Sequence, residues 1–169
     1  MAPVLSLPIR MLPLIVLQGF ATGALAGPLD GKSYILELSS TQFTSGYGEY
    51  LIPSLASALD RAGLRPHNGP GADVVVNIIT ASDVGQWLGE GDAKEWIYTV
   101  DITVGISPET YMIPLDGTPV LGVRARLRTP NADRTDELDC LTRLAARTAV
   151  ANYGKTGTLQ TDGSSCLRK

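Results

Sequence analysis

This sequence of 169 residues lacks the patterns that identify common enzymes and metal proteins. It has one histidine, His67, and two cysteines, too few for a multi-histidine site or a closed zinc site built from these residues. It contains no His-Glu-x-x-His, Gly-x-Ser-x-Gly, Cys-x-x-Cys or phosphate-binding P-loop motif. We therefore expect no catalytic residue, no metal and no cofactor, and we interpret His67 as a surface side chain.

Long hydrophobic runs are also missing. The apolar run at residues 11–20 is shorter than the roughly 20 residues of a membrane-spanning helix, and no second run follows it. Arg10 precedes this run, and the small-x-small pattern Ala24-Leu25-Ala26 follows it, as in a secretory signal peptide. We predict that residues 1–26 are a cleavable signal peptide, cut between Ala26 and Gly27, and that the mature chain has no transmembrane segment.

An apolar N-terminal helix is the alternative interpretation of this region. It fits poorly, because Pro3, Pro8 and Pro13 would interrupt a packed soluble helix. No cysteine stands directly after the predicted cleavage site, so we expect no lipid anchor there. The predicted location of the protein is therefore periplasmic or secreted.

Neither sign of charge dominates the remaining chain. Without residues 1–26 it has 13 basic and 17 acidic side chains, a mildly acidic balance that gives no general attraction for nucleic acid. Its length suits one domain, which we place at residues 27–153. Residues 154–169 are rich in Gly, Ser and Thr and are predicted to form a flexible tail.

The two cysteines are Cys140 and Cys166. In an exported protein such a pair favours a disulfide, which would tie the tail to the domain. Two independent thiols are the alternative.

Hydrophobic periodicity predicts an α+β fold. Strands are expected at residues 34–39, 73–81, 96–106 and 120–128, with a further short one at 111–113, and helices at 50–62 and 134–152. Pro53 is tolerated only in a first turn, so the regular part of the first helix should begin near Ile52. This order favours a two-layer sandwich, in which two helices pack on one face of a mainly antiparallel sheet of about four strands. The first strand–helix–strand unit is the candidate for one parallel pairing.

Three arginines alternate along the last predicted strand. Arg124, Arg126 and Arg128 share one face, because side chains in a strand alternate with a period of two. Such a ladder can hold phosphate or carboxylate groups through paired donors. The alternative is a solvated face that pairs across strands with Asp101 and its neighbours.

Two tryptophans flank a glycine-rich hairpin tip at residues 85–95. Exposed Trp87 and Trp96 would mark a contact surface for a protein or a membrane interface. Alternatively, both rings fold back and cover the edge of the core. The acids around this hairpin are interpreted as solvated, although they could bind calcium or form an acid–base pair: Asp83, Glu90, Asp92 and Glu95.

One segment resembles a known family. A helix ending in Ala62-Gly63-Leu64, a short polar loop and then the run Ala72-Asp73-Val74-Val75-Val76 resemble small envelope proteins of Gram-negative bacteria. These include lipoproteins of the DUF4136 type and the lipopolysaccharide-assembly lipoprotein. The resemblance covers residues 32–152 in architecture and 62–76 in motif, and it implies a β-α-β-β-α domain that acts as a partner or assembly factor. This chain differs in having no lipobox cysteine.

The leading hypothesis is an exported, periplasmic, non-catalytic interaction or assembly factor at the cell envelope. Its partner would be an envelope protein or an anionic lipid headgroup, contacted by the arginine face or by the Trp hairpin. A module that binds a small ligand between helices and sheet is the first alternative. A hydrolase with an unrecognised site is the second.

Overall fold

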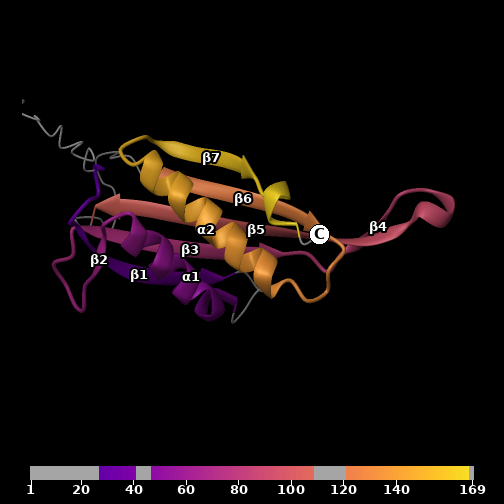
Figure 1. Cartoon of the computed structure of the whole chain (residues 1–169), viewed down its shortest axis with the longest axis horizontal. Helices are drawn as coiled ribbons and strands as arrows, with labels where there is room; N and C mark the ends of the chain where they lie inside the picture. Colours follow the sequence, from indigo (N-terminus) through magenta and orange to yellow (C-terminus); the bar gives the residue numbers. More distant parts are fainter. Residues whose placement is uncertain (1–26, 41–46, 109–120, 168–169) are drawn as a thin grey trace, which may run out of the picture.

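The computed structural model describes residues 27–40, 47–108 and 121–167. Two helices cover one face of a twisted sheet, and a hairpin arm extends beyond one end of that sheet (Figure 1). The strands are β1 (Ser33–Ser40), β2 (Arg65–Pro66), β3 (Val74–Ser82), β4 (Gln86–Leu88), β5 (Glu95–Pro108), β6 (Leu121–Thr129) and β7 (Gly157–Asp162). The helices are α1 (Tyr47–Arg61) and α2 (Thr135–Ala151), with short 3-10 turns η1 (Gly91–Ala93) and η2 (Ser164–Cys166).

The sheet is larger and more parallel than we predicted. Within the described residues it has seven strands in the order β2-β1-β3-β5-β6-β7, with β4 paired to β5 outside this path. β1 is parallel to β3 across α1, and β6 is parallel to β7 across α2, so each helix is the crossover of a strand–helix–strand unit. Only the central pairs β3–β5 and β5–β6, together with β4–β5, are antiparallel. The short strand expected at 111–113 lies outside the described residues.

The core fills the space between the helices and the sheet. α1 lies over β1 and β3, and α2 lies over β5 and β6. Alternate residues of β6 point into this layer as expected, with Val123, Ala125 and Leu127 all buried. The residues between them lie on the other face, which no described helix covers (Figure 1).

Helix α1 begins earlier than the proline rule suggested. It starts at Tyr47, so Pro53 lies inside the helix and not in its first turn. Pro53 is exposed, and its missing N–H removes one backbone hydrogen bond, while buried Leu51, Leu55 and Leu59 hold the helix on the sheet.

A glycine ends α1 as expected. Gly63 adopts φ +85°, and the amide of Leu64 donates to the carbonyl of Leu59 at 3.1 Å, as at a glycine-capped helix end.

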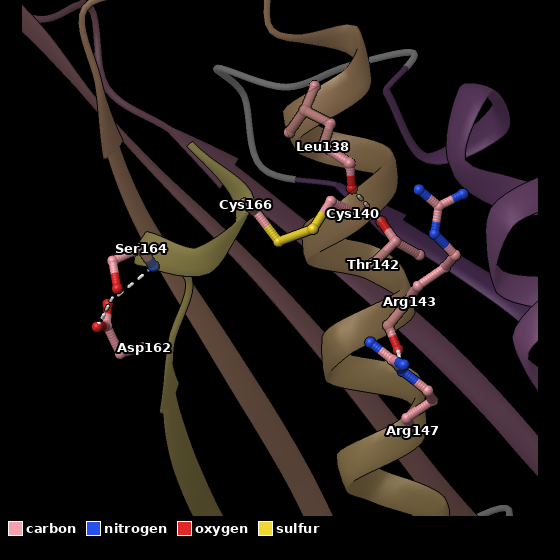
Figure 2. Close-up of a disulfide and its surroundings, with 8 residues drawn as sticks. All are labelled: Leu138, Cys140, Thr142, Arg143, Arg147, Asp162, Ser164 and Cys166. Carbon is pink, nitrogen blue, oxygen red and sulfur yellow. Dashed lines mark hydrogen bonds between the residues drawn. A yellow bond between two sulfur atoms is a disulfide. The ribbon is translucent and has the colours of Figure 1, made fainter. Parts of the chain in front are cut away.

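The C-terminal segment contains structure that its sequence did not indicate. Within the predicted tail, residues 157–162 form edge strand β7, and the chain then turns through η2. Cys140 on α2 and Cys166 in η2 form the predicted disulfide, with Cα atoms 5.6 Å apart (Figure 2). The bond therefore fastens the end of the chain to the helix layer.

Removing the disulfide should reduce stability without changing the fold. It closes a loop of about 27 residues, for which chain entropy predicts a loss of about 3–4 kcal/mol in Cys140→Ser/Cys166→Ser. Urea unfolding measures this loss. Reducing agent should lower the stability of the wild type to that of the variant and leave the variant unchanged. If the two proteins are equally stable without reducing agent, the prediction is wrong.

Candidate functional site

The hairpin arm, residues 84–97, is the most prominent surface feature. β5 continues beyond the ends of β3 and β6, and there its first residues pair with β4 alone. Trp87 lies directly opposite Trp96, and Leu88 lies opposite Glu95. The arm therefore projects away from the two-layer body, as Figure 1 shows.

The arm presents apolar side chains to solvent. Trp87 is 63% exposed and Val84 is 74% exposed, while Leu88 is at 36%. Trp96 is half-buried and packs edge-to-face against Trp87, with ring centroids 5.3 Å apart. Trp87 therefore does not cap the core. Val84 was not among the contact residues predicted from the sequence, although it is an apolar residue beside the first turn of the hairpin.

A carboxylate and a glycine fix the base of the arm. Asp83 accepts hydrogen bonds from the amides of Thr99 at 2.8 Å and Gly85 at 3.0 Å. Partial burial raises the pKa of Asp83, but these hydrogen bonds outweigh it, so its pKa lies below the ordinary value. Gly85 adopts φ +86°, and a Cβ there would collide with the indole of Trp96. Both residues thus set the direction in which the arm leaves the sheet.

A row of stacked side chains connects the arm to helix α2. Trp96 packs edge-to-face on Tyr98 at 6.5 Å between centroids. The guanidinium of Arg134, which precedes α2, lies 4.2 Å from the centroid of the Tyr98 ring. No local sequence pattern indicates this contact, because residues 98 and 134 meet only through the packing of α2 on β5.

The arginine ladder lies on the sheet face away from the helices, and two of its members hold a carboxylate. Asp101 on β5 is opposite Arg126 on β6, and it accepts two hydrogen bonds from Arg126 at 2.8 and 3.0 Å. Arg124 adds a third at 2.9 Å. The interaction with Asp101 raises the pKa of Arg126. The cross-strand pairing considered for this face therefore exists at Arg124 and Arg126.

Arg128 is the remaining member of the ladder. It is exposed, and no ion pair joins it to a described residue. It lines an open groove of about 510 Å³ at the ends of β6 and β7. The groove also includes Gln160, Asp162, Ser164 and Leu167, and Ser164 donates to Asp162 at 2.6 Å. This groove lies beside η2 and not between helices and sheet.

The other candidates do not come together. His67 is exposed, and its Nε2 lies 3.3 Å from the Pro70 carbonyl oxygen. Within the described residues, no group of three His, Cys, Asp or Glu side chains is placed to hold a metal. No helix in the described part of the chain is long and apolar enough to cross a membrane. Ala26 lies outside the described residues, and Gly27 is exposed.

Asp101→Asn should destabilise the fold by about 1–2 kcal/mol. The carboxylate is only 12% exposed, whereas the Arg124 and Arg126 side chains are 40% and 50% exposed, so solvent compensates part of the loss. Urea unfolding measures the change. The control Asp92→Asn, at an exposed position on the arm, should stay within about 0.5 kcal/mol of wild type. Equal stabilities of the two variants would show that the pairing contributes nothing.

No protein-family model matches this chain and no curated protein matches it, so the family resemblance drawn from the sequence is not confirmed. The chain is similar to a minor lipoprotein from Acinetobacter baumannii, with 18% identity, coverage of 71% of this chain and 87% of that one, and a TM-score of 0.40. The chain is also similar to the PelC dodecamer from Paraburkholderia phytofirmans, with 12% identity, coverage of 75% of this chain and 94% of that one, and a TM-score of 0.47. A third similar structure is a neuraminyllactose-binding hemagglutinin homologue from Helicobacter pylori, with 16% identity, coverage of 75% of this chain and 80% of that one, and a TM-score of 0.32.

Proposed function

We propose that this chain is an exported, non-catalytic protein of the cell envelope that binds a partner protein through its arm. The observation that carries the proposal is the 63% exposure of Trp87 at a position raised away from the body of the protein. Tryptophan is enriched among the residues that contribute most to protein interfaces, because it buries a large area at low entropic cost. Val84 and Leu88 extend the apolar surface around it.

The charge of the arm indicates what kind of partner fits. The arm carries Glu90, Asp92 and Glu95 against the single basic residue Lys94. An acidic arm is repelled by an anionic membrane surface, so its apolar side chains suit a protein pocket with a basic rim. Of the two surfaces expected from the sequence, the arm is the better contact, because two arginines of the ladder already hold Asp101.

Binding of a small ligand is a second candidate function. The β6–β7 groove favours it, because about 510 Å³ lies within the range of about 300–1,000 Å³ that is typical of ligand sites. The exposed guanidinium of Arg128 and the amide of Gln160 would supply its polar contacts.

Trp87 should be the main contact residue. A photo-crosslinking amino acid at position 87 in living cells should capture a defined partner, identified by mass spectrometry. Trp87→Ala should lower the affinity for that purified partner at least about tenfold, as expected for a buried interface tryptophan. The matched control is Ile79, an apolar residue on the sheet that is 38% exposed: crosslinking there and Ile79→Ala should have no effect. Capture at position 79 alone would overturn the proposal.

Export is the other part of the proposal, supported by the N-terminal pattern and by the Cys140–Cys166 disulfide, which forms in oxidising compartments. In cells that express the whole chain, the protein recovered from the periplasm or medium should begin at Gly27 and have both cysteines oxidised. Intact-mass measurement before and after reduction and alkylation tests both points. A cytoplasmic protein that keeps residues 1–26 would contradict it.

A further inference from the structure

Three arginines from the two helices surround one small depression on the helix layer. Arg61 is the last residue of α1, and Arg143 and Arg147 lie one turn apart on α2. Together with Ala58 they line a cavity of about 100 Å³. Figure 2 shows Arg143 and Arg147 on the side of α2 away from the disulfide, where α1 passes.

Hydrogen bonds hold two of these side chains along their helices. Arg61 donates from Nε to the Ser57 carbonyl at 3.0 Å and from a terminal nitrogen to Ser57 Oγ at 2.7 Å. Arg147 donates from Nε to the Arg143 carbonyl at 3.3 Å. Each guanidinium has five N–H donors, so most of the donors around the cavity remain available for a ligand.

This cluster brings three positive charges to one site. No ion pair joins Arg61, Arg143 or Arg147 to a described residue, although Asp139 lies one turn before Arg143. Like charges four residues apart destabilise a helix by a few tenths of a kcal/mol, and Arg143 and Arg147 have this spacing. In a chain that is acidic overall, this contrasts with Arg124 and Arg126, which share Asp101.

We infer that the depression between α1 and α2 binds a phosphate group. Planar guanidiniums match the oxygens of phosphate with paired donors, and three of them supply the charge that a phosphate monoester or diester needs. The volume of about 100 Å³ leaves room for a tetrahedral oxyanion beside the three side chains. Ala58 leaves space at the floor of the site because its side chain is short. A free phosphate and a phospholipid headgroup share this chemistry.

The test uses purified residues 27–169 and two probes at constant ionic strength. Inorganic phosphate should raise the unfolding temperature in a saturable manner, compared with chloride. Flotation with phosphatidylcholine vesicles, with and without phosphatidylglycerol, distinguishes a headgroup from a free anion. Binding of either probe supports the site if Arg143→Gln/Arg147→Gln weakens it at least about tenfold.

Arg65→Gln is the matched control, because Arg65 is an exposed arginine on β2 that lines neither the depression nor the β6–β7 groove. It should bind both probes as the wild type does. Without a probe, Arg143→Gln/Arg147→Gln should be at least as stable as the wild type, because like-charge repulsion is removed; a purely structural role would lower its stability. The inference is overturned if neither probe gives saturable binding, or if the two variants bind equally. The arm is not involved, so this result is independent of the proposed function.

Discussion

The backbone hydrogen-bonding of β5 is the constraint on which the rest of the structure depends. From Tyr98 onward this strand pairs with β6, and from Val100 onward it also pairs with β3. Its first residues continue past both neighbours and pair only with β4. An isolated two-stranded hairpin is marginally stable in water, so the arm depends on a strand that is fixed in the sheet. The same strand supplies Asp101 to the arginines and part of the core beneath α2.

Local patterns in the sequence were sufficient for most of the elements and for the inward-facing residues. Alternation along residues 120–128 correctly separated the buried residues of β6 from its arginines, because a period of two follows from strand geometry alone. The Trp hairpin was found for a similar reason, since its turn residues and its aromatic residues are close in sequence. The disulfide followed from the number of cysteines and the expected compartment.

Contacts made across the fold could not be obtained in this way. β7 has the sequence GTLQTD, which lacks a clear apolar alternation, and its pairing with β6 depends on a crossover through α2. Two further contacts depend on how the helices pack. One is the contact of Arg134 with the Tyr98 ring, and the other brings Arg61 together with Arg143 and Arg147. No local pattern reports such packing, because it is decided by the shapes of both layers.

Packing within the arm explains one ring of the Trp pair and leaves the other unexplained. Cross-strand aromatic contact explains Trp96, which is half-buried between Trp87 and Tyr98 and covers Gly85. It does not explain why Trp87 leaves 63% of its surface in water, or why Val84 and Leu88 beside it are apolar. A hairpin selected only for its own stability and solubility would carry polar residues at these outward positions. The packing of the fold therefore leaves the exposed side of the arm unexplained, and this apolar surface is the observation behind the proposal that the arm binds a partner.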